Sequence, residues 1–373
     1  MDSLTEANNM LAITLLKKLC KEKTENVLFS PPSLSSALAT ILLGAKNDTA
    51  AQIEHLFSLD RDGDINLGFQ SLLTEMNKPV TLYLLGTTNR LFFRENALNF
   101  LPSFKESCEK FYNSVLEDVC FSEEAEAVRK HINAWVAENT EGKILEALPE
   151  DSVNPLSLLI FVNAININLK WKTDTEPMKR CSFVSFKQMH RISQIMVKEE
   201  GFLGFYIEEL GANVCISTHN RMDWNIILVL PVDDGKKMEE GLTYETFITW
   251  TKPEAVDLME ILRKQLFLPR IKIEESYDMV HILCSLGISD AFQEDKADFS
   301  GLSTLKDLHL LSVFHLSFLE FTEEGIKASA ATVAVEIPGN AKGKGLKTPS
   351  LFFFFIWSHK IKSILFCGRV CIP

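Results

Sequence analysis

The sequence predicts one large α+β domain that spans residues 1–373. Three observations lead to this prediction. Helical periodicity dominates the first half, strand-like runs dominate the second half, and no repeat or proline- and serine-rich linker divides the chain. Hydrophobic residues make up 46% of the sequence and charged residues 24%, which is the composition of a globular protein and excludes a disordered or fibrous chain.

Two helices are predicted with clear boundaries. Ser30 is a typical N-cap residue, Pro31 suits the first helical position, and apolar residues at helical spacing continue until Gly44. A second helix is expected over 122–140, where acidic residues crowd the first turn and an apolar stripe follows. This stripe is typical of an amphipathic surface helix.

Strands are predicted from short apolar runs that are bounded by turn residues. The run at 158–165 is apolar apart from Asn163, as in a strand that is buried on both faces. The stretch with the composition of an open loop is 338–349, which holds three glycines and three lysines. The other predicted strands lie in the second half, at 224–230, 266–273, 313–321, 351–357 and 363–370.

Charge and hydropathy argue against several partners. The chain has 38 basic against 50 acidic side chains, and this acidic balance disfavours a nucleic-acid partner held through phosphates. The longest apolar run, 351–357, is too short to cross a bilayer, and the first residues lack the pattern of a cleaved signal peptide. The eight cysteines show no pairing pattern, so we expect free thiols, a cytoplasmic location and no membrane partner.

Motifs of common enzymes do not occur in the sequence. No Gly-x-Ser-x-Gly turn presents a nucleophile. The eight histidines form no HxxxH or HxH pair, so no metal site is expected. The glycine-rich stretch 339–345 lacks the Gly-Lys-Ser/Thr ending of a phosphate-binding loop. We therefore expect no catalytic residues, no cofactor and no enzymatic activity.

The segment 325–335 is unusual for its small residues. Read with a period of two, one face of this segment can enter a sheet between existing strands without displacing much core. The alternative is an alanine-rich helix, since alanine is the best helix former, although β-branched residues weaken it toward the end. The residues alone leave both structures open. The residues of that face are Ile326, Ala328, Ala330, Thr332 and Ala334.

Motifs along the whole chain are similar to those of one protein family: NVLFSP (26–31), FQSLLTE (69–75), RKHIN (129–133), TEGKI (140–144), FVNAI (161–165), LPR (268–270), DAF (290–292), ADFSG (297–301) and ILFCGR (364–369). On these motifs the chain resembles a serpin over essentially its full length. Within the family it resembles the intracellular ovalbumin-type (clade B) branch, near the placental thrombin inhibitor and the granzyme B inhibitor. The resemblance implies a large central mixed sheet, two further sheets, eight or nine helices and an exposed reactive-centre loop.

The resemblance also implies a suicide inhibitor of serine proteases. The target protease attacks the loop, forms an acyl-enzyme, and is trapped when the cleaved loop inserts into the central sheet. Counted as in the family, hinge and loop occupy 323–347 and the scissile bond is Gly339–Asn340. The expected partner is a target protease, and the chain is expected to be a monomer, cytoplasmic or released by an unconventional route. The hinge residues implied are Glu323, Glu324, Gly325, Ile326, Ala328, Ala330, Ala331 and Thr332.

Two polar sites are implied residue by residue. The family's shutter is a buried cluster beneath the centre of the sheet that changes its hydrogen bonds when the strands part. The family's breach is the place where insertion begins. From the residues alone, the alternatives are an ordinary buried histidine in the first site and a surface ion pair of little worth in the second. The shutter corresponds to Ser30, Ser33, Asn163 and His315, and the breach to Trp171, Arg270 and Glu323.

Several positions depart from the family pattern. Ile326 and Lys327 replace the usual threonine and glutamate of the hinge, and Gly339 fills no primary specificity pocket of a protease. The hinge changes are tolerable, because Ile326 is apolar and Lys327 faces outward, and Gly339 leaves the target protease unknown. Further departures are Asn166, Ile167 and Leu169, in place of an aromatic pair and a glycine, and Ser217–His219, in place of Leu-Pro-Tyr. These fit an alternative function, that of a non-inhibitory or degenerate serpin that a protease cleaves as an ordinary substrate.

Overall fold

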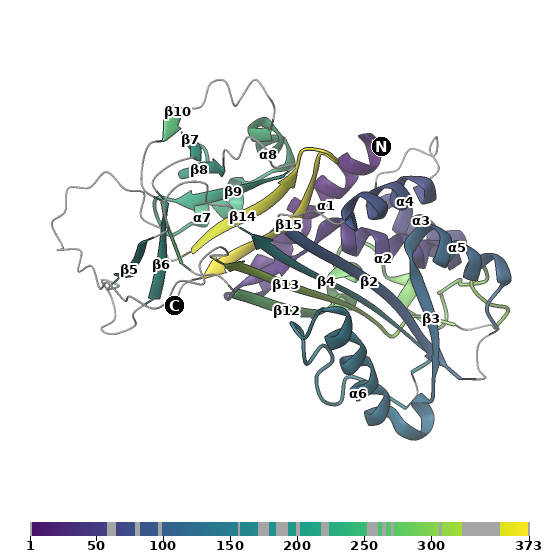
Figure 1. Ribbon diagram of the computed structural model, residues 1–373. Helices are drawn as coiled ribbons and strands as arrows, with labels where there is room; N and C mark the ends of the chain where they lie inside the picture. The colour runs from purple at the N-terminus through teal and green to yellow at the C-terminus, as the bar shows by residue number, and fades with distance from the viewer. Residues whose placement is uncertain are drawn as a thin grey trace.

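The structure is a computed structural model of the 373-residue chain, drawn as a ribbon in Figure 1. α2 to α5, which come from the first third of the chain, lie near one end of a central sheet. A second sheet lies at the other end of the central sheet. The residues that the structure describes are 2–57, 65–78, 83–95, 99–155, 157–170, 179–183, 193–198, 202–217, 224–251, 260–262, 266–269, 272–305, 308–322 and 351–371.

α2 begins at the start signal that the sequence supplies. α2 begins at Pro31, directly after the extended residue Ser30, and ends at Gly44. The longer helices are α1 (Asp2–Glu22), α2 (Pro31–Gly44), α3 (Asn47–Leu56), α4 (Ile65–Met76), α5 (Pro102–Tyr112) and α6 (Phe121–Asn139). The shorter ones are α7 (Lys236–Gly241), α8 (Tyr244–Thr251), α10 (Val280–Ser285) and a 3-10 turn at Asp290–Phe292.

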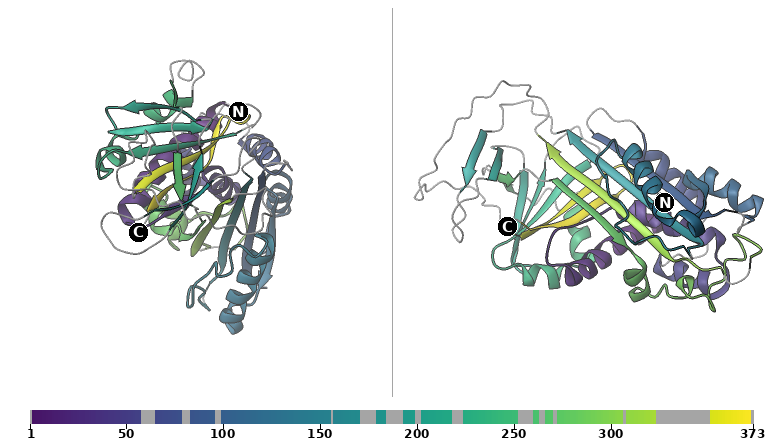
Figure 2. Two further views of the ribbon diagram at one scale, coloured as in Figure 1. Left: turned by 60° about the vertical axis from the view of Figure 1, so that its left-hand side comes forward. Right: turned by 90° about the horizontal axis from the view of Figure 1, so that it is seen from below.

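The central sheet mixes parallel and antiparallel neighbours. Its strand order is β12-β13-β4-β2-β3. β13 runs parallel to β4 and β2 runs parallel to β3, whereas β12 with β13 and β2 with β4 are antiparallel. Figures 1 and 2 show α6 along one face of this sheet. The strands are β2 (Tyr83–Arg94), β3 (Ser114–Val119), β4 (Leu159–Lys170), β12 (Lys272–Asp278) and β13 (Ser312–Thr322).

Two further sheets complete the described part of the fold. One has the order β1-β15-β14-β9-β8-β7-β10 and packs against α1 and α2. The other has the order β11-β6-β5. Their strands are β1 (Val27–Phe29), β5 (Lys179–Phe183), β6 (Ser193–Lys198), β7 (Phe202–Ile207), β8 (Ala212–Ser217), β9 (Trp224–Pro231), β10 (Glu260–Leu262), β11 (Leu266–Pro269), β14 (Leu351–Ser358) and β15 (Ser363–Cys371).

The central sheet is covered on both faces, so β4 and β13 contribute to two hydrophobic clusters. Alternate residues of a strand point to opposite faces. Phe161 and Ile165 of β4 therefore join the large core around α2, whereas Val162 and Ala164 join a second cluster beneath α6. This arrangement explains why the strand reads as a nearly continuous apolar run, as the sequence predicted.

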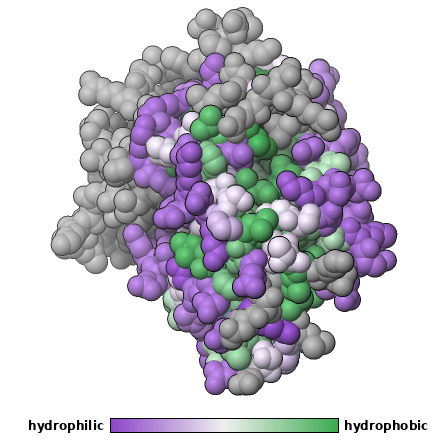
Figure 3. All heavy atoms as spheres, turned by 90° about the vertical axis from the view of Figure 1, so that its right-hand side faces the viewer, coloured by the Kyte–Doolittle hydropathy of each residue, from purple (hydrophilic) through white to green (hydrophobic). Residues whose placement is uncertain are grey.

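The α3, α5 and β3 end of the molecule is shown in Figure 3, where hydrophobic residues interrupt a mostly hydrophilic surface. Exposed large hydrophobic side chains in the described part of the chain include Leu67 of α4 and Val115 of β3, which are 50% and 49% exposed. Isolated exposed hydrophobic residues are usual on protein surfaces.

The predicted α+β class, with a central mixed sheet and two further sheets, is confirmed. The helices expected at 31–44 and 122–140 are present as α2 and α6. The division into a helical first half and a stranded second half is wrong, because β2 and β3 also lie in the first half. The single strand expected at 266–273 is two strands in different sheets, β11 and β12, which are separated after Pro269.

Candidate functional site

The structure places only one of the sites implied by the resemblance. The hinge, the bond Gly339–Asn340 and the breach residues Trp171, Arg270 and Glu323 lie outside the described residues. The four shutter residues are all described, all 0% exposed and close together: Ser30, Ser33, Asn163 and His315.

Strand register brings the polar side chains of this cluster into one row. His315 of β13 lies opposite Asn163 of β4, and Asn163 lies opposite Asn89 of β2. Opposite residues in a sheet project from the same face, so a polar row crosses three neighbouring strands. Beneath the row, Ser33 in the first turn of α2 reaches the middle strand.

Asn163 uses its whole side-chain amide in this row. Its Nδ2 group donates to Asn89 Oδ1 at 2.6 Å and to Ser33 Oγ at 2.8 Å. Its Oδ1 atom lies 2.5 Å from His315 Nδ1 and accepts from the Ser33 hydroxyl at 3.1 Å. A buried amide that satisfies both its donor and its acceptor costs little to bury, whereas an unpaired one costs about 1–3 kcal/mol.

The hydrogen bonds define the tautomer of His315. Because Asn163 Oδ1 can only accept, His315 Nδ1 carries the proton and donates to it. His315 Nε2 is then the acceptor for the backbone N–H of Ser30 at 3.2 Å and for the Ser317 hydroxyl at 3.0 Å. Complete burial lowers the pKa of His315 from 6.5 to about 3, so the ring is neutral at physiological pH.

Ser30 has a different role from the one its position predicted. It occupies the N-cap position of α2, but its side chain makes no capping hydrogen bond. Its backbone N–H holds His315, and its Oγ atom is buried without a hydrogen-bond partner among the described residues. This unsatisfied hydroxyl is a place where the buried cluster is less than fully bonded.

Two residues of the row were missed by the sequence analysis, namely Asn89 and Ser317. Asn89 is 4% exposed and Ser317 is 0% exposed. The signal for Ser317 was available, because it lies two positions from His315 in a predicted strand and so shares its face. Asn89 could not be placed, because β2 was not predicted.

The polar row spans the boundary between two halves of the central sheet. β13 and β4 form a parallel ladder in which Ser312–Thr322 pairs with 160–170. The His315–Asn163 hydrogen bond crosses this ladder in its first half, at the fourth residue pair from Ser312. We call this ladder the seam. Parting β4 from β13 requires breaking that hydrogen bond.

The cluster offers hydrogen bonds and no charge. In the described part of the chain, no group of three or more His, Cys, Asp or Glu side chains is arranged to hold a metal ion. No described helix is long and apolar enough to span a membrane. The site that the structure defines is therefore a buried hydrogen-bonded junction between α2 and three strands.

Comparisons with known proteins define the class of this fold and junction. The family model described as Serpin (serine protease inhibitor) matches residues 6–373, and the chain belongs to this family. Its relatives are serpins of the B branch, as the motifs implied. The chain is 45% identical to Serpin B8 of Homo sapiens over 381 residues and 44% identical to Serpin B6 of Macaca fascicularis over 381 residues, with 100% of each chain covered.

A solved structure supports the same assignment. The structure entitled "The 2.1 A structure of a tumour suppressing serpin" superposes with a TM-score of 0.85 at 30% identity, and 100% of both chains is covered. The likeness extends over the whole described fold, including the central sheet that contains the seam.

Proposed function

We propose that this serpin inhibits serine proteases as a suicide substrate. The protease cleaves the reactive-centre loop within 323–347 and remains bound as an acyl-enzyme. The freed loop then inserts into the central sheet between β4 and β13. In this proposal the chain is an inhibitor and not an enzyme, and its partner is a protease of the serine class.

The observation that carries the proposal is the parallel seam. β13 ends at Thr322, directly before the proposed hinge residue Glu323. A chain that turns back after β13 runs antiparallel to it, and because β4 is parallel to β13, the same chain is antiparallel to β4 as well. A strand that enters the seam therefore replaces one parallel ladder by two antiparallel ladders, which are slightly more stable per residue.

The hydrogen bonds gained on insertion supply the driving force. Each added ladder bond contributes about 0.5–1.5 kcal/mol net, so a dozen or more can offset distortion of the protease active site. The uncleaved form then persists because the barrier to insertion is high, and not because it is the most stable arrangement. The junction of Asn163 and His315 belongs to this barrier, because it crosses the seam.

The family's pattern assigns roles to residues outside the described part of the chain. The proposed scissile bond is Gly339–Asn340, and Trp171, Arg270 and Glu323 form the proposed breach at the start of insertion. Ile326 faces inward in the inserted strand, where an apolar side chain costs packing and not charge burial. Lys327 faces outward and stays hydrated.

The proposal is tested with a panel of trypsin-, chymotrypsin- and elastase-like proteases. The expected product is a covalent complex that resists SDS and carries the mass of both proteins. Ala328→Arg, on the inward face of the hinge, blocks insertion because a buried charge is costly, so this variant is cleaved without forming a complex. Ser329→Arg is the matched control, since its side chain projects outward and the complex is retained.

The alternative is a non-inhibitory or degenerate serpin that is cleaved as an ordinary substrate, which the departures at Asn166, Ile167, Leu169 and Ser217–His219 favour. It predicts clean cleavage of the unchanged protein with no complex and no rise in the melting temperature of the nicked chain. That result contradicts the inhibitor proposal. The monomeric state and the cytoplasmic location stay predictions, to be checked by ultracentrifugation and cell fractionation.

A further inference from the structure

The segment that joins α6 to β4 lies across the seam on the face opposite the polar row. We call residues 140–155 and 157–158 the strap. Ile144, Ala147 and Leu148 of the strap are at most 1% exposed. They share one buried cluster with Val162 of β4 and Leu316 of β13. The strap therefore covers the two strands that part when the seam opens.

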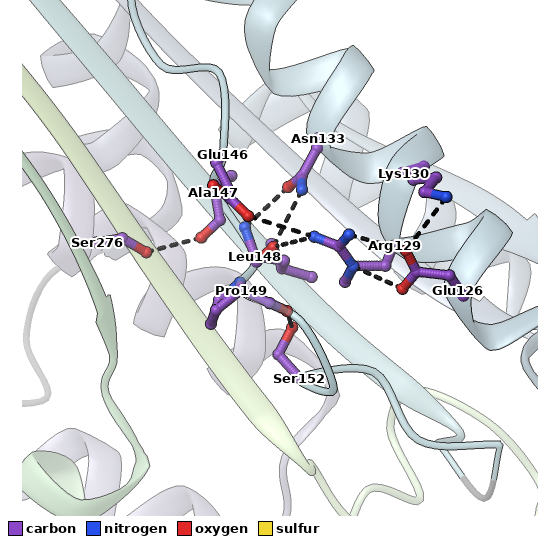
Figure 4. Close-up of polar contacts among 10 residues, drawn as sticks. All are labelled: Glu126, Arg129, Lys130, Asn133, Glu146, Ala147, Leu148, Pro149, Ser152 and Ser276. Atoms are coloured by element: carbon purple, nitrogen blue, oxygen red, sulfur yellow. Dashed lines mark hydrogen bonds and ion pairs between the residues drawn. The ribbon is translucent and has the colours of Figure 1, made fainter.

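On one side the strap is bound tightly to α6. Asn133 of α6 binds both backbone groups of Leu148: its Nδ2 donates to the carbonyl oxygen at 3.0 Å, and its Oδ1 accepts from the N–H at 2.8 Å. Arg129 Nη1 donates to the same carbonyl oxygen at 2.8 Å. Arg129 Nε and Nη2 in turn donate to the Glu126 carboxylate, at 2.7 and 2.8 Å. Figure 4 shows these contacts.

On the other side the strap is bound to β12 and β13, the two strands on the far side of the seam from β4. Ser276 of β12 donates from its hydroxyl to the carbonyl oxygen of Ala147 at 2.8 Å, which is also drawn in Figure 4. Lys143 Nζ lies 3.6 Å from Glu320 Oε2 of β13 and 5.5 Å from the centroid of the Phe318 ring. The Lys143 and Glu320 side chains are 31% and 14% exposed, and ion pairs near the surface contribute little.

A single peptide group thus joins the two halves of the sheet. The carbonyl of Ala147 and the N–H of Leu148 belong to the same planar unit. One end of this unit is bonded to β12 and the other end to α6, which packs on β2 through Trp135 and Phe92. Entry of one strand moves β12 and β13 about 4.8 Å from β4, and no hydrogen bond of 2.8 Å survives such a displacement at both ends.

The side that gives way is the one with fewer bonds. Two hydrogen bonds from Asn133 and a charge-assisted bond from Arg129 hold the α6 end, whereas one neutral bond from an exposed serine and one ion pair hold the other end. We call the bonds that tie the strap to α6 and to β12 the latch, and we propose that the Ser276–Ala147 hydrogen bond is its release point. Its use in loop entry rests on the proposed function.

Ser276→Ala tests the latch in the intact, uncleaved chain. Amide hydrogen exchange followed by mass spectrometry reads the opening of the seam in peptides that cover 159–170 and 312–322. Loss of one such hydrogen bond is expected to speed exchange of these amides about two- to tenfold. The β14–β15 amides, which lie in another sheet, are expected to exchange at an unchanged rate.

Ser152→Ala is the matched control. Ser152 makes a hydrogen bond of the same kind, from its hydroxyl to the Pro149 carbonyl oxygen at 2.7 Å, but both residues belong to the strap. This variant is expected to leave exchange at the seam unchanged. Equal exchange in the two variants overturns the proposal, and so does faster exchange of all sheets in Ser276→Ala, because that indicates general destabilisation.

The same experiment separates this inference from the proposed function, since no protease takes part in it. If the seam opens faster in Ser276→Ala but no protease complex forms in any variant, the latch stands and the inhibitor proposal fails. If complexes form while Ser276→Ala leaves exchange at the seam unchanged, the inhibitor proposal stands and the latch is refuted.

Discussion

The polar row predicts that the buried histidine His315 makes the protein less stable at acidic pH. The neutral ring of His315 has its Nε2 lone pair facing the Ser30 N–H and the Ser317 hydroxyl, and complete burial lowers its pKa to about 3. In the unfolded chain a histidine takes up a proton near pH 6.5. Below that pH the histidine is protonated in the unfolded state but not in the folded state. The free energy of unfolding therefore falls as the pH falls.

The expected magnitude follows from the two pKa values. His315 contributes its full stabilisation above pH 6.5 and loses about 1.4 kcal/mol per pH unit below it, until the folded pKa of about 3 is reached. Between pH 6.5 and 5.0 this single group accounts for about 2 kcal/mol. The slope of His315 is isolated by comparison with a variant that lacks this ring.

The assay is urea unfolding of the unchanged protein and of His315→Asn, each between pH 7.5 and 5.0. The variant is expected to be less stable at pH 7.5, because it breaks up the row, but to have a slope lower by about 1.4 kcal/mol per unit below pH 6.5. His281→Gln, which removes an exposed imidazole, controls for the loss of one histidine. Equal slopes for the unchanged protein and His315→Asn refute the reasoning.

An NMR measurement keeps the prediction testable if His315→Asn does not fold. The ring nitrogens of His315 in the unchanged protein are expected to show the neutral form with the proton on Nδ1 at pH 5. Titration of this ring near pH 6.5 contradicts both the tautomer and the buried environment that the hydrogen bonds indicate.

Two further predictions concern stability and use urea unfolding as the measurement. Asn89→Ala leaves one buried N–H of Asn163 without its partner and is expected to cost about 1–3 kcal/mol; a loss below 0.5 kcal/mol contradicts the network. Gly368→Ala places a Cβ atom 2.0 Å from the Val27 carbonyl oxygen and is expected to break the β1–β15 pairing, with misfolding or a loss above about 3 kcal/mol. Gly68→Ala, whose Cβ meets only the end of Leu4 at 3.0 Å, is the control and is expected to change stability by less than about 1 kcal/mol.

Local sequence signals predicted the elements whose burial pattern is regular. The Ser30–Pro31 start placed α2, and the apolar run around Asn163 placed the core of β4. β2 was missed because Thr87, Thr88 and Asn89 interrupt its apolar alternation. A polar residue at position 89 is explained by its hydrogen bond to Asn163 of β4. The sequence alone does not show that β2 and β4 are neighbours.

The functional residues likewise fall into those that the sequence predicted and those that it did not. Ser30 and Asn163 lie in family motifs, which carry each of them at a fixed place, whereas Ser33 and His315 were assigned from the overall resemblance. The latch could not be predicted, because Asn133, Ala147 and Ser276 come from three segments with no joint pattern in the sequence. Hydrogen bonds to backbone groups are especially hard to foresee, since every residue offers the same N–H and carbonyl.

Contacts on both faces of the central sheet connect the two sides of the seam, and both contribute to the barrier to its opening. On the face toward α2, the Asn163–His315 bond joins the two strands directly. On the other face, one residue further along, Ala164 and Leu316 lie in the cluster that the strap covers, and Ser276 ties the strap to β12. Both connections cross the same boundary, so both break in the same opening event. Asn89→Ala removes a partner that holds Asn163 in place and so weakens its bond to His315 on one face, whereas Ser276→Ala weakens the other face. In combination their effects on seam exchange are expected to add, as for independent sites on one barrier. A combined effect no larger than that of one variant indicates that a single connection limits opening.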